Sequence, residues 1–217
     1  MDGGWLNRAL SSPAAASAQT GADSKHGRRE PRISSGALDV VAREARLTMM
    51  HPIDTPRLRL EPLVPAHAVA LFEGLSDPRI YAFLDERPPA SLAALEERYE
   101  RLAIRRSPDG RDRWLNWALF SPEAGCHVGY VQATAHPDAT AEIAYVLFPP
   151  WWGRGHAREA VLAMIAHLRE RHGVTRFIAQ IHPENHRSIA LVTALGFARI
   201  GRRAATDGAP DDEVYGL

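Results

Sequence analysis

The chain has one cysteine, no long apolar run and no excess of charge of either sign. Because Cys126 is the only cysteine, no disulfide can form within the chain, and a reducing cytoplasm is the expected setting. No run of about 18 apolar residues occurs, so the sequence indicates no membrane span. Basic and acidic residues balance at 26 each, which predicts no general attraction to nucleic acid or to an anionic membrane.

What the sequence does contain is typical of a globular protein. Its 217 residues are 45% hydrophobic and 24% charged, enough to bury a full core. The composition changes near residue 50: the preceding stretch is rich in Ser, Ala, Gly and Arg and has no sustained apolar periodicity. We therefore predict a disordered N-terminal extension over residues 1–50 and a single domain over residues 51–217. Met49 and Met50 directly precede the first strong strand, which favours a translation start there over a functional tail.

From residue 51 the apolar pattern alternates between the periods of strands and helices. Helices are predicted at 65–75, from Ser91 to about 102, at 154–171 and at 185–195. Strands are predicted at 57–63, 113–121, 127–136, 140–148, 176–181, 197–202 and 213–217. Turn residues separate the three central strands and favour antiparallel hairpins. The predicted fold class is α+β, with a mixed, mostly antiparallel central sheet of about seven strands flanked by helices.

The most informative segment joins a predicted strand to a predicted helix and reads Trp152-Gly153-Arg154-Gly155-His156-Ala157. The first turn of a helix carries unpaired N–H groups and a partial positive charge, and glycines let a phosphate approach the backbone closely. Arg154 and Arg158 can add positive charge at the same point. The segment therefore predicts an anion site.

Three other interpretations of this loop compete. A dinucleotide fingerprint needs a third glycine, and Arg158 stands in its place. A nucleoside triphosphate loop needs Gly-Lys followed by Ser or Thr, which is missing. A tight turn whose glycines serve only packing also fits, and two glycines alone do not exclude it.

A second segment, downstream of the loop, weighs against the interpretation as a turn that serves only packing. The predicted strand 176–181 leads into Asn185-His186-Arg187-Ser188, and the helix that follows ends at Leu195-Gly196-Phe197. Together with the glycine loop, this segment resembles the GNAT N-acetyltransferase superfamily, whose coenzyme loop has the general form Gln/Arg-x-x-Gly-x-Gly/Ala. Thr55-Pro56-Arg57-Leu58-Arg59-Leu60 looks like the opening strand of the branch containing the ribosomal-protein (RimJ/RimL-type) N-terminal acetyltransferases. The resemblance covers about residues 53–217.

The resemblance implies a coenzyme site. In this family the pantetheine arm of acetyl-CoA lies between two splayed strands, and the loop at the start of the next helix holds the diphosphate. Carried over, the coenzyme-binding residues are Val146, Leu147 and Phe148 for pantetheine, Gly153, Arg154, Gly155, His156, Ala157 and Arg158 for the diphosphate, and Asn185 and Ser188 from the last helix. Helix capping is an alternative, compatible role for Asn185.

The resemblance also implies the chemistry. A neutral amine attacks the thioester directly, so a base must take the proton of the ammonium form. Glu142 matches a position where several family members keep a catalytic glutamate, and a solvated or ion-paired glutamate fits equally well. Many relatives have a tyrosine four residues after the serine to protonate the thiolate. Here that residue is Val192, so either another group, such as Tyr145, protonates the thiolate or the thiolate leaves unaided.

The function expected from the resemblance is transfer of an acetyl group from acetyl-CoA, in a ternary complex, to a protein N-terminus or a small-molecule amine. The alternative is a catalytically idle module that binds acyl-CoA as a sensor or scaffold. No metal is expected, since Pro183 breaks the helical phasing of His182 and His186 and no further ligand motif accompanies them. The resemblance is compatible with a homodimer but does not decide the oligomeric state.

Overall fold

The computed structural model describes residues 50–204 and 210–217, so the predicted N-terminal extension lies, apart from its last residue, outside the described residues. Over these ranges the strands are β1 (Ile53–Asp54), β2 (Arg59–Pro62), β3 (Arg113–Ser121), β4 (Cys126–Ala135), β5 (Thr140–Leu147), β6 (Arg176–Ile181), β7 (Ala198–Arg203) and β8 (Asp212–Gly216). The helices are α3 (His67–Leu75), α4 (Leu92–Ala103), α5 (His156–His172) and α6 (His186–Ala194), with 3-10 turns η1 (Pro78–Phe83) and η2 (Pro149–Trp151).

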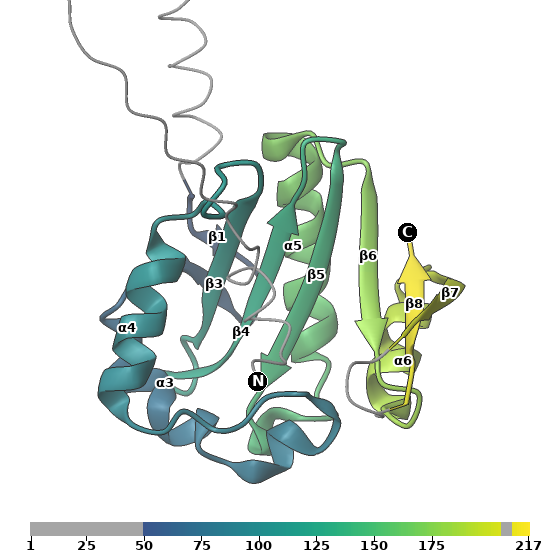
Figure 1. The fold of residues 1–217 in the computed structure, drawn as a ribbon. Helices are drawn as coiled ribbons and strands as arrows, with labels where there is room; N and C mark the ends of the chain where they lie inside the picture. Colours follow the sequence, from purple (N-terminus) through teal and green to yellow (C-terminus); the bar gives the residue numbers. More distant parts are fainter. Residues whose placement is uncertain (1–49, 205–209) are drawn as a thin grey trace, which may run out of the picture.

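All of these strands belong to one sheet, in the order β1-β2-β3-β4-β5-β6-β8-β7 (Figure 1). Neighbouring strands are antiparallel except for β5 and β6, which run parallel. The predicted fold class is confirmed. The two-residue β1 and the η1 turn were not predicted, because both are too short to show an apolar period.

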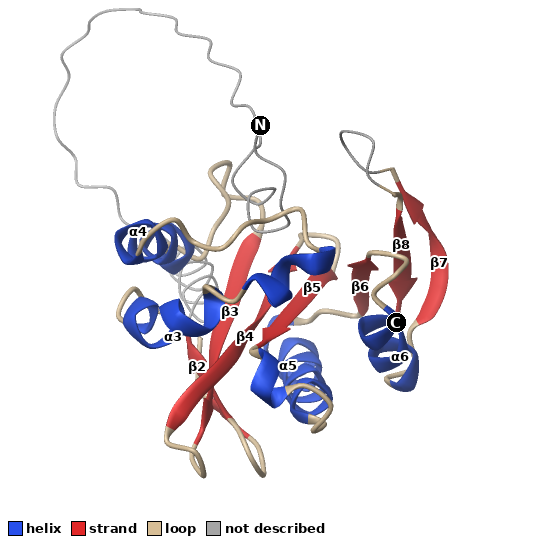
Figure 2. Ribbon diagram, turned by 90° about the horizontal axis from the view of Figure 1, so that it is seen from below, coloured by secondary structure: helices blue, strands red, loops and turns tan. Residues whose placement is uncertain are grey.

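Helices cover both faces of the sheet. Figure 2 shows α3 and α4 on one face and α5 on the other, with α6 beside β6. Each face has its own apolar cluster: one is built around α5 and the inner strands, and the other around α3, α4 and Phe148. None of the described helices combines the length and apolarity that crossing a membrane requires.

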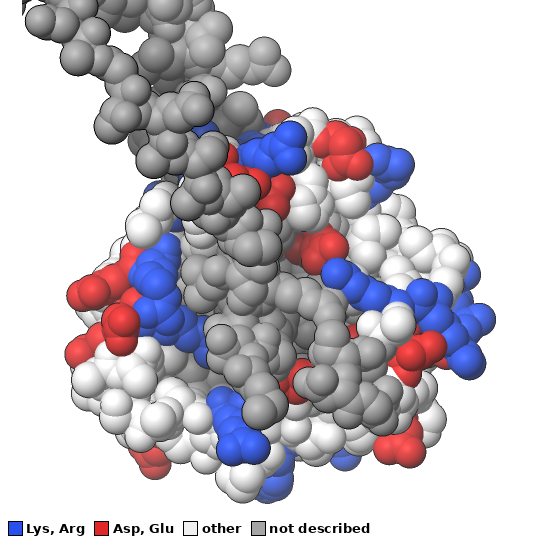
Figure 3. Space-filling model, in the orientation of Figure 1, with Lys and Arg blue, Asp and Glu red and all other residues white. Residues whose placement is uncertain are grey.

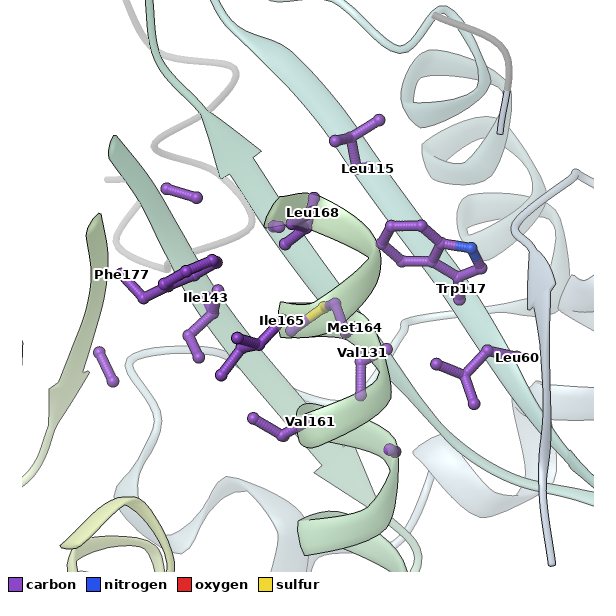
Figure 4. Packing of buried hydrophobic residues seen from close by; sticks show 14 of the residues in the cluster. Leu60, Leu115, Trp117, Val131, Ile143, Val161, Met164, Ile165, Leu168 and Phe177 are labelled. Atoms are coloured by element: carbon purple, nitrogen blue, oxygen red, sulfur yellow. The ribbon is translucent and has the colours of Figure 1, made fainter. Parts of the chain in front are cut away.

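Helix α5 is the central packing element. Its residues Val161, Met164 and Leu168 are fully buried, and Figure 4 shows this row directed at strand residues that include Trp117 and Phe177. Burying a side chain of this size contributes about 1.5–3 kcal/mol. The helix begins two residues later than predicted because Gly155, which precedes it, adopts a left-handed conformation.

The parallel pair opens along its length. Residues Thr140–Glu142 of β5 pair with Arg176–Ile178 of β6, but no pairing continues beyond them. From residue 178 onward β6 is instead paired with β8 on its other side. The two strands therefore separate toward the carboxyl end of β5, where the glycine loop follows.

Candidate functional site

The glycine loop leads into the first turn of α5. Gly153 and Gly155 have φ angles of 72° and 80°, in the left-handed region that favours glycine. Gly155 is the N-cap, and its carbonyl accepts the first helical hydrogen bond. Helix geometry leaves the N–H groups of His156, Ala157 and Arg158 without an acceptor inside the helix. The loop thus presents backbone donors at the positive end of the helix dipole, an arrangement suited to a diphosphate.

Arg57, from a distant part of the sequence, holds this loop. Its Nη1 donates to the carbonyl oxygen of Arg154 at 2.8 Å, and its Nε donates to Glu159 Oε2 at 2.7 Å. The backbone N–H of Arg57 and the hydroxyl of Thr55 both donate to Glu159 Oε1, at 2.8 and 2.7 Å. Burial raises the pKa of the Glu159 carboxyl, but these hydrogen bonds outweigh it and hold the pKa below its ordinary value. Arg57 therefore ties the loop to the first turn of α5, and Thr55 helps to hold Glu159 in that turn.

The side chain of His156 is directed inward. Its ring is buried and packs edge-to-face on Trp151, with centroids 5.2 Å apart. Burial lowers the pKa of this imidazole, and the positive charges of Arg57 and Arg154 lower it further. The ring is therefore held neutral, and the backbone N–H of His156 is the group placed to meet an anion.

A cleft occupies the gap between β5 and β6. It is lined by residues 143–146 of β5, 179–181 of β6, the α6 N-cap Asn185 and Ser188 of α6, and residues 83–86, from the end of η1 onward. The ring of Phe83 lies 5.5 Å from that of His182, so the end of η1 reaches across to the β6 side. Among the described residues lining this cleft there is no lysine or arginine.

The start of α6 forms one end of the cleft. Asn185 is the N-cap, and its Oδ1 accepts the N–H of Ser188 at 3.2 Å, so the capping role is confirmed. The hydroxyl of Tyr145 donates to the carbonyl oxygen of Ser188 at 3.4 Å, and burial raises the pKa of Tyr145 to about 12. Asn185 and Ser188 both line the cleft, and their contact with a coenzyme stays a prediction.

The backbone of β5 faces alternately toward β4 and toward the gap. The carbonyl of Val146 points toward β4, and the N–H of Phe148 donates to a β4 carbonyl at 2.9 Å. The carbonyl of Leu147 accepts a hydrogen bond from Trp152 Nε1 at 2.6 Å. By this alternation Tyr145 and Leu147 direct their backbone groups toward the gap, where an extended ligand could pair with them.

Glu142 lies just beyond the cleft, whose β5 lining begins at Ile143. Its Oε1 is 3.8 Å from Arg203 Nη1 and 4.0 Å from His136 Nε2. By strand alternation it shares a face of β5 with Ala144. The ion-paired interpretation of Glu142 therefore has a structural basis, and its role as a base stays a prediction.

The sequence profile of the acetyltransferase (GNAT) domain matches residues 57–198, more than half of the chain, from the segment before β2 to the start of β7. The chain belongs to the GNAT acetyltransferase family. The family uses acetyl-CoA as its acyl donor.

Relatives of known sequence or structure support the assignment. The uncharacterized N-acetyltransferase YoaA of Bacillus subtilis (strain 168) is 23% identical over 175 residues, covering 77% of this chain and 97% of YoaA. A putative acetyltransferase from T. thermophilus is 28% identical, with a TM-score of 0.64 over 78% of this chain and 89% of that one. RimL, a ribosomal L7/L12 alpha-N-protein acetyltransferase in complex with coenzyme A, is 18% identical and shares the fold, with a TM-score of 0.68 over 77% and 97% of the two chains.

In this GNAT chain the usual tyrosine of the last helix is replaced by Val192, which is fully buried in the core. A valine at this position can pack but cannot donate a proton. Tyr145 reaches α6 from β5, one turn before Val192, and its hydroxyl lies at the cleft. Tyr145 thus contacts the helix that carries Val192, and a role of its hydroxyl as proton donor stays a prediction.

Positive charge gathers at the outer strands. Figure 3 shows blue side chains on the side where β7 and β8 lie in Figure 1. Arg199 and Arg202 both pair with the buried carboxylate of Glu213 on β8. These arginines therefore hold β7 to β8.

One group among the described residues could supply three metal ligands, namely Glu61, His67 and His127. Glu61 Oε2 lies 3.2 Å from His67 Nε2 and 3.1 Å from His127 Nε2. Nδ1 of His67 accepts the N–H of Val64 at 3.1 Å, which assigns the proton of the neutral ring to Nε2. A metal at Nε2 needs the opposite tautomer, so this geometry favours hydrogen bonds to Glu61 over ligation.

Sequence reasoning missed several residues of this region. Arg57 was selected only as part of an opening strand, although it lies in a recognisable Thr-Pro-Arg segment. Glu86, Gln132 and Gln180 line the cleft and were not selected. Glu86 lies in irregular backbone before two prolines, where no periodic pattern could have identified it.

Proposed function

We propose that this protein transfers the acetyl group of acetyl-CoA to a primary amine by direct attack in a ternary complex. The observation that carries the proposal is the separation of β5 from β6 immediately beside the N-terminus of α5. An extended pantetheine arm can occupy such a gap and pair with the free edge of β5, while the diphosphate meets the amides after Gly155.

The proposed acceptor is a protein N-terminus or a small-molecule amine. Ribosomal-protein acetylation by RimL and by the S5-alanine acetyltransferase from Vibrio fischeri, whose folds are similar, supports the first choice. The open cleft between the end of η1 and β6 supports either, because it gives an amine access to the strand that would hold the thioester.

The test is thiol release from acetyl-CoA in the presence of an amine panel, with acetylation of the amine verified by mass spectrometry. The panel contains a tetrapeptide with a free N-terminus, spermidine and kanamycin. The proposal predicts amine-dependent thiol release and one acetyl group on at least one acceptor. Thiol release that no amine accelerates would contradict it.

The second candidate, an idle acyl-CoA sensor, draws on the buried Val192 where relatives have a proton donor. It predicts that acetyl-CoA binds tightly, as measured by calorimetry, and that none of the amines in the panel causes acetyl-CoA to be consumed. The same two measurements therefore separate the candidates.

A further inference from the structure

A second, smaller cavity adjoins the cleft on the face covered by α3 and α4. Its walls are mostly apolar and aromatic, and they come from α3, η1, α4, β3, β4 and the loops after β2 and η1. Three residues, Glu86, Tyr130 and Gln132, line both the cleft and this cavity. Glu86 therefore lies on the wall that the cleft and the second cavity share.

Glu86 belongs to an ion pair that is largely removed from solvent. Its Oε2 lies 3.2 Å from Arg98 Nη2, and the two side chains are only 13% and 23% exposed. Desolvating two charges costs several kcal/mol per ion, so such a pair is weak evidence for a role in stability. Buried, paired charges in a cleft are instead typical of functional sites.

The surroundings of Glu86 suit a cation that can lose a proton. Tyr81 and Tyr99 line the second cavity, and Tyr130 lies between the two spaces. Burial, and then the charge of Glu86, raise the pKa of Tyr130 well above its ordinary value, so its hydroxyl stays protonated. Aromatic faces and a carboxylate together attract ammonium groups.

Oxygen acceptors without partners line the same cleft. The side-chain carbonyl oxygens of Gln132 and Gln180 are buried and accept no hydrogen bond from the described residues. Both residues line the cleft, one from β4 and one from β6. An ammonium group carries three N–H donors, and Glu86, Gln132 and Gln180 offer oxygens that can accept from it. Asp85 and His182 also line the cleft.

Resting on the proposed function, we propose that Glu86 binds the ammonium group of the acceptor and takes the proton that the nitrogen must lose before attack. Glu86 then fills the role that the family resemblance implied for Glu142, which lies beyond the cleft lining. Arg98 fixes the Glu86 carboxylate from the side of the second cavity.

The proton balance is complete. The ammonium gives one proton to the Glu86 carboxylate, which later passes it to solvent. The neutral nitrogen then attacks the thioester carbon, so that the C–N bond forms and the C–S bond breaks. The second proton leaves the nitrogen and ends on the departing thiolate, which gives an amide and free coenzyme A thiol.

The test compares Glu86→Gln with two other variants of the full-length chain. Glu97→Gln is the matched control, since Glu97 also pairs with an α4 arginine but is exposed. Glu142→Gln tests the rival base. Calorimetry with coenzyme A measures binding, and steady-state kinetics use whichever of the tetrapeptide, spermidine or kanamycin the wild type acetylates best. Because Glu86→Gln leaves Arg98 without its partner, Glu86→Asp and Glu86→Gln/Arg98→Gln are measured as well.

We expect Glu86→Gln to lower kcat/KM for the acceptor about 100-fold at pH 7 while coenzyme A binding changes less than about threefold. With the tetrapeptide the loss should shrink to within about tenfold at pH 10, where its α-amino group is already neutral; with spermidine it should shrink less, because alkyl amines are still largely protonated there. Glu86→Asp should recover part of the activity, and the double variant should not. An equal loss at both pH values, or a pH-dependent loss in Glu142→Gln but not in Glu86→Gln, overturns the assignment. Coenzyme binding without transfer to any acceptor by the wild type would overturn the proposed function itself.

Discussion

The guanidinium of Arg57 donates a hydrogen bond to the carbonyl oxygen of Arg154 across 2.8 Å, which joins the segment before β2 to the loop before α5. The same guanidinium pairs with Glu159 in the first turn of that helix, at 2.7 Å. Arg57 thus neutralises a carboxylate that would otherwise oppose an anion at the helix N-terminus, and it sets the orientation of the Arg154 peptide. The loop is therefore shaped by a residue outside its own sequence.

Replacing Arg57 with Ala should weaken coenzyme A binding. Hydrogen bonds to charged groups contribute about 1.5–3 kcal/mol each, but the Arg57 side chain is 44% exposed and solvent screens it. We expect a loss of about 1–2 kcal/mol, or roughly 5–30-fold in Kd. Calorimetry measures the Kd. Arg59→Ala is the control, because Arg59 lies on the adjoining strand and its nearest carboxylate oxygen is 3.8 Å away. Equal Kd values for Arg57→Ala and wild type would contradict the role of Arg57.

Gly129→Ala should destabilise the fold and move β5. A Cβ at Gly129 would lie 2.0 Å from the carbonyl oxygen of Val146, a backbone atom that cannot move alone. Overpacking of this kind costs about 1–3 kcal/mol, and we expect the upper end. Urea denaturation measures the free energy of unfolding. A Cβ at Gly201 would have no atom within 4 Å, so Gly201→Ala should change the free energy of unfolding by less than about 0.5 kcal/mol. Similar values for the two variants would refute the close contact.

The Glu61 cluster predicts a pH-dependent contribution to stability. Burial raises the pKa of Glu61, but hydrogen bonds from His127 and His67 outweigh it and lower the pKa below the ordinary 4.5. A carboxyl with a lowered pKa in the folded state stabilises the fold above its unfolded pKa, and this contribution is lost as the pH falls through the folded value. His67, His127 and Arg59 are the charged or titratable groups that face it.

Glu61→Gln should therefore lower the free energy of unfolding by about 1 kcal/mol at pH 7, a modest amount because the carboxylate is 30% exposed. The difference from wild type should shrink as the pH falls below 4.5. Denaturation at a series of pH values measures it. If the difference in the free energy of unfolding between wild type and Glu61→Gln grew toward low pH, the predicted direction of this pH dependence would be wrong.

Tyr145→Phe should lower kcat more than it changes coenzyme binding. The hydroxyl contacts α6 at Ser188, beside the position where Val192 replaces the usual proton donor. Loss of a general acid typically costs on the order of 100-fold in rate. With its pKa near 12, the hydroxyl stays protonated across the assay range. Single-turnover kinetics with the best acceptor give the rate. An unchanged rate would mean that the thiolate leaves without help from Tyr145.

The fold could largely be predicted from the sequence because its signals are local. The apolar rows of α5, the cap at Ser91 and the turns between β3, β4 and β5 each depend on residues close together in the chain. The Ser91 hydroxyl accepts the N–H of Ala94 at 3.1 Å, as a cap should. The glycine loop was recognised for the same reason.

The site could be predicted only where it follows one segment. Arg57 contacts Arg154, and Glu86 and Tyr130 line one cleft, through tertiary packing that no apolar period in the sequence indicates. The sequence also could not predict which backbone carbonyls of β5 face the gap, because the strand register decides this. The surroundings of Glu142 were equally beyond the sequence: its neighbours Arg203 and His136 come from other strands and loops, and its role as a base stays a prediction.

The measurement that tests the central claim most directly is acetyl-CoA binding by Gly155→Val, with Gly125→Val as the control. Both glycines have left-handed φ angles, 80° and 65°, but Gly125 lies in the open β3–β4 turn and Gly155 caps α5. A β-branched residue is strongly disfavoured at such an angle, so valine should displace the loop amides in one variant and only the hairpin tip in the other. If the diphosphate lies on this loop, calorimetry will show binding by wild type and Gly125→Val and none by Gly155→Val. Binding of acetyl-CoA by Gly155→Val with the wild-type Kd would contradict the account.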